Sequence, residues 1–88
     1  MNNFEISFSF QHHRYQAEVS IIRGVDHIQY TISTTDRHLL NEYGAQVIHE
    51  FAGKPLQIAL PGSTAEQQVY AEAVAVGLQH FLHSTKSP

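Results

Sequence analysis

The sequence predicts an α+β domain: a five-stranded, largely antiparallel sheet with a long C-terminal helix packed on one face, in the order β-β-β-α-β-β-α. Two observations predict this fold. Five short segments alternate apolar and polar residues with the period of two that is typical of half-buried strands. Residues 63–84 instead repeat their apolar residues at helical spacing, over a length that no earlier segment reaches. We therefore expect this helix to cover the sheet.

The first three strands are predicted at residues 4–10, 15–21 and 28–32, with tight turns at residues 11–13 and 23–26. The glycine of the second turn is expected to supply the positive φ that a hairpin turn needs. Consecutive strands joined by short turns predict an antiparallel meander. The side chains expected to face the core are Phe4, Ile6, Phe8 and Phe10, then Tyr15, Ala17, Val19 and Ile21, then Ile28, Tyr30 and Ile32.

A short helix and two further strands are predicted next. Residues 37–43 follow a polar segment suited to a helix cap, and Gly44 is a typical residue for the end of a helix. Residues 46–51 and 56–60 alternate again and predict the fourth and fifth strands. The fourth strand has two possible places, beside the third strand or at the other edge. Its residues expected to face the core are Val47, His49 and Phe51.

The long helix is predicted to start at Ser63, because Ser63 and Glu66 have the spacing of a capping box. Gly77 lies in the middle of this helix, where glycine costs about 1 kcal/mol relative to alanine. A close approach to the sheet or to a partner helix is the expected reason. The apolar positions of the helix are Val69, Tyr70, Ala73, Val74, Gly77, Leu78, Phe81 and Leu82.

The length and composition set limits on the function. The 88 residues predict one domain over residues 1–84, followed by a disordered tail at residues 85–88. The formal net charge is −3, from five Lys and Arg against eight Asp and Glu, which disfavours binding to nucleic acid. The chain has no cysteine, so disulfides and thiolate metal sites are excluded. Without a signal peptide or an apolar run of ~18 residues, a cytoplasmic protein that does not bind membranes is expected.

The width of the sheet predicts that something besides the long helix covers its apolar face. Five strands at ~4.8 Å spacing span about 24 Å, whereas one helix covers only ~10–12 Å. The short helix, a curl of the sheet around the long helix, or a second subunit would complete the core. Only 15% of the residues are charged, so two copies repel each other weakly. We therefore expect a homodimer.

His49 is the first candidate site residue, because the alternation places its imidazole on the apolar side of the sheet. With Tyr15 and Tyr30, which are expected on the same side, it would line a small ligand pocket under the helix. The alternative is a core histidine whose ring nitrogens are satisfied by neighbouring groups.

His80 and His83 are the second candidate, because residues three apart on a helix can place two imidazoles on one metal ion. The alternative is that both are exposed near a helix C-terminus, where cations are favoured. The other ligands of such a site are not apparent, and no cofactor is expected.

No arrangement of residues predicts catalysis. The carboxylates fall at positions expected for solvated faces, turns and helix caps, and no nucleophile–base pair is apparent. The sequence therefore predicts a non-enzymatic interaction module whose partner is a second copy or another protein. The alternative function is a small-ligand or metal-ion binding domain that uses the histidines above.

Overall fold

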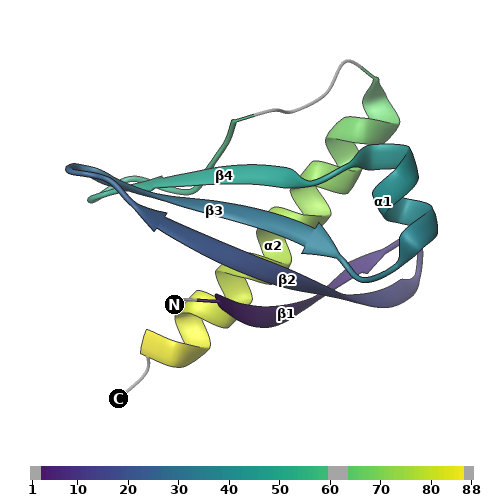
Figure 1. Ribbon diagram of the computed structural model, residues 1–88, viewed down its shortest axis with the longest axis horizontal. Coiled ribbons are helices and arrows are strands. Elements are labelled where there is room, and N and C mark those ends of the chain that lie inside the picture. Colours follow the sequence, from purple (N-terminus) through teal and green to yellow (C-terminus); the bar gives the residue numbers. More distant parts are fainter. Residues whose placement is uncertain (1–2, 60–63, 87–88) are drawn as a thin grey trace.

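The computed structural model describes residues 3–59 and 64–86, and it has the predicted order of elements. The strands pair antiparallel in chain order within one sheet (Figure 1). The predicted fold class is therefore confirmed, and the fourth strand lies beside the third. The elements are β1 (Asn3–Phe10), β2 (His13–Arg23), β3 (His27–Thr34), α1 (Arg37–Tyr43), β4 (Gln46–Phe51), β5 (Gln57–Ile58) and α2 (Ala65–Lys86).

The short helix α1 returns the chain to the edge of β3. Its start is capped by Asp36, whose carboxylate accepts a hydrogen bond of 3.0 Å from the backbone N–H of Leu39. It ends at Gly44, which has φ 72° and donates its N–H to the carbonyl of Leu40 at 2.9 Å. A helix of two turns is too short to carry the chain across the sheet, so β4 pairs with the strand that precedes α1.

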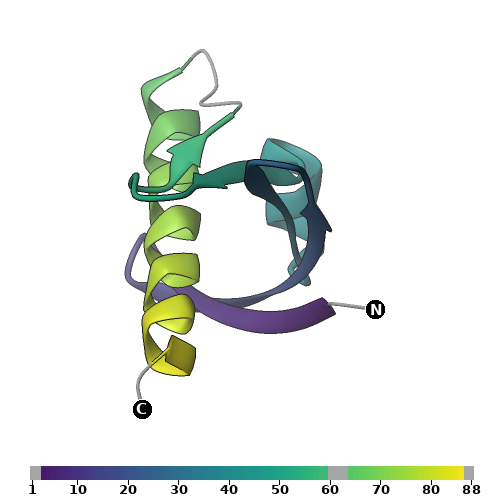
Figure 2. The ribbon, with the colours of Figure 1, turned by 90° about the vertical axis from the view of Figure 1, so that its left-hand side faces the viewer.

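The sheet curls, and α2 closes the side that the curl leaves open (Figure 2). The helix packs mainly on β1 and also contacts β4 and β5, which lie at the opposite edge of the sheet. The curl, together with α1, thus completes the core within one chain. The apolar core residues that are at most 4% exposed are Ile6, Phe8, Phe10, Ala17, Val19, Tyr30, Ile32, Ile48, Tyr70, Ala71, Val74 and Leu78.

The turn between β1 and β2 has positive φ at both of its residues, although it contains no glycine. Gln11 and His12 have φ values of 52° and 66°, the pattern of a type I′ turn. The expectation of a positive φ at Gly24 is wrong. Gly24 instead lies close to His27, where an added Cβ would be 2.9 Å from the imidazole Cε1. An added Cβ would also lie 3.2 Å from the carbonyl oxygen of His27, so a larger residue here would require the imidazole and the turn to shift slightly.

The orientation of β4 is the main error of the sequence prediction. Gln46 and Ile48 are 6% and 0% exposed, so the even-numbered residues face the core and His49 lies on the outer face of the sheet. The side-chain amide of Gln46 donates to the carbonyl of Tyr43 at 3.3 Å. Because the end of α1 satisfies this amide, Gln46 is tolerated on the inner face, although the alternation predicted it on the outer one.

The ends of α2 also differ from the prediction. The capping box is formed one residue later, by Thr64 and Gln67. The hydroxyl of Thr64 accepts from the N–H of Gln67 at 3.1 Å, and the side chain of Gln67 accepts from the N–H of Thr64 at 3.3 Å. Ser63 lies outside the described residues. At the other end the helix continues to Lys86, so residues 85 and 86 are helical rather than part of a disordered tail.

Candidate functional site: the outer face of α2

Two faces of α2 carry apolar residues, and only one of them packs on the sheet. Tyr70, Val74 and Leu78 are buried, whereas Val69 and Val76 are 55% and 52% exposed. The second face forms what we call the outer stripe of α2. Successive members are four or three residues apart, which is the spacing of a coiled-coil seam. The outer stripe consists of Val69, Ala73, Val76, His80 and His83; Ala73 lies at its edge and also packs against the core.

Gly77 brings this helix against the backbone of the edge strand β1. A Cβ added at Gly77 would lie 2.6 Å from the carbonyl oxygen of Ser7 and 2.6 Å from Cβ of Phe8. The predicted close approach to the sheet is therefore confirmed. One end of the contact is held by Phe4 and Phe81, whose rings stack with centroids 4.4 Å apart.

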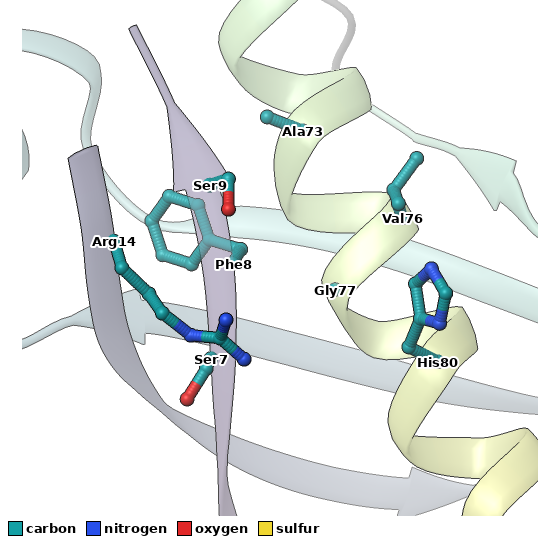
Figure 3. Close-up of a pocket in the computed structure, with 8 residues that line it drawn as sticks. All are labelled: Ser7, Phe8, Ser9, Arg14, Ala73, Val76, Gly77 and His80. Carbon is teal, nitrogen blue, oxygen red and sulfur yellow. The ribbon is translucent and has the colours of Figure 1, made fainter. Parts of the chain in front are cut away.

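A crevice of about 470 Å³ runs along this contact, between β1 and the outer stripe (Figure 3). Ser7, Ser9 and Arg14 line its sheet side, and the side chain of Arg14 extends from β2 toward β1. A second hollow of about 220 Å³ borders Val76 on its other flank. Val76 is therefore a ridge between two grooves, a shape that a second helix can match by ridge-into-groove packing.

The predicted metal pair lies on this stripe. His80 and His83 are both exposed. In residues 3–59 and 64–86, no group of three or more His, Cys, Asp or Glu side chains is placed to hold a metal ion. Binding of a metal by this pair stays a prediction.

The three residues of the predicted ligand pocket are not brought together. Tyr30 is buried on the inner face, and its hydroxyl donates a hydrogen bond of 2.6 Å to Glu50. Burial, and after it this hydrogen bond, holds the pKa of Tyr30 well above its ordinary value. The ring of Tyr15 packs on Phe8 with centroids 5.7 Å apart. His49 lies on the opposite face of the sheet from Tyr30, so it cannot line a pocket with these tyrosines.

His49 belongs instead to an aromatic cluster on the outer face of the sheet. Its ring centroid is 5.3 Å from that of His27 and 6.0 Å from that of Phe51. The cluster spans β3 and β4, where His27 and Phe51 are directly opposite. The inward placement of His49 was wrong because both alternating sets of residues 46–51 contain apolar side chains, so the period alone does not choose between them.

Sequence reasoning missed Glu50 and the outer stripe. Glu50 was predicted to be a solvated carboxylate. Nothing in residues 46–51 indicates that it accepts a hydrogen bond from the hydroxyl of Tyr30. The signal for the outer stripe was present in the sequence. Val69 was counted with the buried apolar face, and Val76 was not assigned to any face, although both lie on the same exposed side of the helix. Ala73 packs against the core, as predicted.

In comparisons with known proteins, no family model, no curated protein and no solved structure matches this chain. Among the helices of the described residues, none combines the length and the apolar character that crossing a membrane requires. The function is therefore argued from the surfaces above.

Proposed function

We propose that the protein is a non-enzymatic interaction module that forms a homodimer through the outer stripe of α2. The observation that carries the proposal is the pair of half-exposed valines, Val69 and Val76. They are seven residues, or about two helical turns, apart on the face opposite the core. Completing the burial of a valine contributes roughly 1 kcal/mol, so four valines from two copies contribute about 4 kcal/mol. This magnitude supports a dimer that depends on concentration rather than a permanent one.

The placement of Glu72 and His80 favours an antiparallel pairing of the two helices, because a carboxylate can accept a hydrogen bond from an imidazole N–H. Glu72 precedes Val76 by four residues and His80 follows it by four, and both are exposed. In an antiparallel pair centred on Val76, Glu72 of each copy lies opposite His80 of the other. A parallel pair would place Glu72 opposite Glu72, which is unfavourable. Both arrangements can be two-fold symmetric, as a closed homodimer requires, so the side-chain pairing rather than the symmetry favours the antiparallel pair.

Sedimentation velocity over a range of protein concentrations tests this proposal. The wild-type chain is expected to shift from monomer to dimer as concentration rises, and Val76→Glu is expected to stay monomeric, because it would bury two like charges at the two-fold axis. The matched control is Val25→Glu in the β2–β3 turn, where the valine is fully exposed and does not belong to the outer stripe of α2. A wild-type chain that is monomeric at millimolar concentration, or equal effects of the two variants, contradicts the proposal.

A cysteine variant gives an independent readout, because the chain contains no cysteine. Val76→Cys is expected to form a disulfide between two copies under mild oxidation, since the two residues meet at the symmetry axis. Val25→Cys is expected to crosslink far more slowly. Equal crosslinking at both positions would indicate random collision rather than a defined interface.

A further inference from the structure

Two histidines lie next to each other on the outer face of the sheet, on neighbouring strands. His27 is the first residue of β3, and His49 lies in β4. His27 pairs with Phe51 and His49 pairs with Gln29. The two histidines are therefore diagonal neighbours on one face, within reach of each other. Their ring centroids are 5.3 Å apart, and both residues are half-buried.

The imidazole of His27 is held in one orientation by three neighbours. Its Nδ1 forms a hydrogen bond of 3.0 Å with the carboxylate of Asp26. The ring of Phe51 stacks on it, with centroids 5.2 Å apart and an angle of 26° between the ring planes. The backbone of Gly24 comes so close that a Cβ added there would lie 2.9 Å from Cε1 of the ring. The ring is therefore oriented before any ligand binds, as a preorganised site requires.

The hydrogen bond with Asp26 determines which ring nitrogen of His27 can bind a ligand. It lowers the pKa of Asp26, so this carboxylate is ionised at neutral pH and can only accept hydrogen bonds. Nδ1 of the neutral ring therefore carries the hydrogen, and the lone pair of Nε2 points away from Asp26. His49 also lies away from the turn, because it pairs with Gln29, two residues farther along β3 than His27. A carboxylate that orients a metal-binding histidine in this way is common in metal sites.

We propose that His27 and His49 form a site for a late first-row divalent metal ion, of the class of Ni²⁺, Cu²⁺ and Zn²⁺. These ions bind imidazole nitrogens well, whereas Mg²⁺ and Ca²⁺ prefer oxygen ligands. At metal–nitrogen distances of ~2.0–2.1 Å, two imidazoles that share one ion have centroids roughly 5 Å apart, close to the observed 5.3 Å. Water fills the other positions, since the described residues contain no group of three ligand side chains. The ion is therefore bound more weakly than in a structural site with four protein ligands.

Titration of the full chain with ZnCl₂, followed by NMR of the histidine ring nitrogens, tests the proposal. We expect the resonances of His27 Nε2 and of one ring nitrogen of His49 to shift together and to saturate. Nδ1 of His27 is expected to keep its hydrogen, because it faces Asp26. MgCl₂ is expected to cause no such shift. Saturation at other histidines while these two rings do not respond overturns the proposal, and so does an equal response of all seven histidines.

Variants of single histidines, with a matched control, locate the site. His27→Gln and His49→Gln are each expected to weaken Zn²⁺ binding about tenfold or more, because one remaining imidazole cannot chelate the ion. The double variant is expected to be about as weak as either single one, since the two ligands act as a unit. The control is His38→Gln on α1, an exposed histidine 3.4 Å from Glu42, which is expected to change affinity by less than about twofold. Equal effects of His27→Gln and His38→Gln refute the proposal.

Asp26→Ala tests the positioning of His27 without removing a metal ligand. It is expected to weaken Zn²⁺ binding about tenfold, because the ring loses the hydrogen bond that fixes its tautomer. In the same NMR spectra, Nδ1 and Nε2 of His27 are expected to share the hydrogen. A variant that keeps both the wild-type affinity and the wild-type tautomer contradicts this positioning role.

Melting temperatures separate loss of the site from loss of the fold. Saturating ZnCl₂ is expected to raise the melting temperature of the wild type but not of His49→Gln, because a ligand that binds the folded state stabilises it. The absence of a rise in the wild type contradicts the proposal. The site goes beyond the proposed dimer, since neither histidine belongs to the outer stripe of α2. The monomeric variant Val76→Glu is therefore expected to bind Zn²⁺ as the wild type does, whatever the outcome for the dimer.

Discussion

Gly77 shows how a single missing side chain determines the position of a helix. Alanine at this position would gain about 1 kcal/mol of helix propensity. That gain is outweighed, because the new methyl group would lie 2.6 Å from a backbone carbonyl oxygen of β1, which cannot rotate away as a side chain can. Glycine is therefore required for packing, at a cost to the isolated helix.

Gly77→Ala is expected to lower the free energy of unfolding by about 1–2 kcal/mol, the cost of overpacking less the gain in propensity. Urea denaturation followed by far-UV circular dichroism measures this change. The control is Gln68→Ala on the exposed surface of the same helix, for which a change within about 0.5 kcal/mol is expected. A Gly77→Ala variant that is more stable than the wild type contradicts the close packing.

Tyr70 couples the stability of the core to alkaline pH. Its side chain is buried, and its ring stacks on that of Tyr43 with centroids 4.4 Å apart. Burial, and to a smaller extent the nearby charges of Asp36 and Tyr15, raises the pKa of Tyr70 to about 12. In the unfolded chain a tyrosine ionises near its ordinary pKa of about 10.

The sign of the effect follows from this difference in pKa. Between pH 10 and 12 the unfolded chain releases the Tyr70 proton while the folded chain keeps it, so stability is full below about pH 10 and falls as pH rises toward 12. Tyr70 contributes on the order of 2 kcal/mol to this loss. Urea denaturation at pH 8, 10 and 11.5 is expected to show the decline. Tyr70→Phe is expected to have a shallower one, and an unchanged slope would falsify the assignment.

At the residue scale the sequence predicts well only where one strong pattern acts. The alternation of residues 4–10 places four aromatic and aliphatic side chains on one face, and the structure confirms it. Residues 46–51 have weaker alternation, and the two inward polar residues of this strand are satisfied by specific hydrogen bonds, Gln46 with the carbonyl of Tyr43 and Glu50 with the hydroxyl of Tyr30. Tyr30 is twenty residues from Glu50 in the chain, so no local pattern reveals that pair.

At the scale of elements, the β1–β2 turn carries backbone strain at the surface. Gln11 and His12 both have positive φ, which costs a non-glycine residue roughly 1–2 kcal/mol. Type I′ turns favour Asn-Gly for this reason. Both side chains are exposed, so replacing them removes no core contact.

His12→Gly is expected to raise the free energy of unfolding by about 1 kcal/mol, because glycine adopts positive φ without a steric penalty. Thermal and urea denaturation measure the gain. The matched control is His13→Gly, at the first position of β2, which is expected to lose about 0.5–1 kcal/mol because a strand disfavours glycine. Equal changes in the two variants would show that the turn geometry is not the cause.

Helix α1 was predicted at the correct residues, because its cap, its apolar side and its terminal glycine all indicate the same start and end. The start of α2 was predicted one residue too early, because Ser63 and Thr64 are adjacent and both carry a hydroxyl that can cap a helix. Ser63 with Glu66 and Thr64 with Gln67 both fit a capping box, and the described pair is Thr64 with Gln67. Glu66 is engaged elsewhere, because it accepts a hydrogen bond from the hydroxyl of Tyr43.

At the scale of the whole molecule, the curl of the sheet was the feature that the sequence left open. The width of the sheet showed that one helix cannot cover its apolar face. The short helix, a curl of the sheet and a second subunit would each have completed the cover, and the width did not choose among them. The structure combines two of them, since α2 bridges the two edges of a curled sheet and α1 lies at one end. Curvature depends on how all strands twist together, which no single segment encodes.

The histidines predict how the whole surface responds to acid. Adding seven positive charges to a formal charge of −3 reverses its sign, and the calculated pI is about 6.1. Most of the histidines are exposed, so solubility is expected to be lowest near pH 6 and higher at pH 5 and pH 8. Precipitation by polyethylene glycol at these three pH values measures it, and a flat profile would contradict the expectation.

The contact between the last helix and the first strand also has a consequence for synthesis. Strands β1 to β5 each pair with the next along the chain, so the sheet can assemble as the chain leaves the ribosome. Its apolar inner surface, however, is not covered until α2, which is translated after all five strands, has emerged. Nascent chains that stall before residue 65 therefore expose this surface, and they are the species on which chaperones would act.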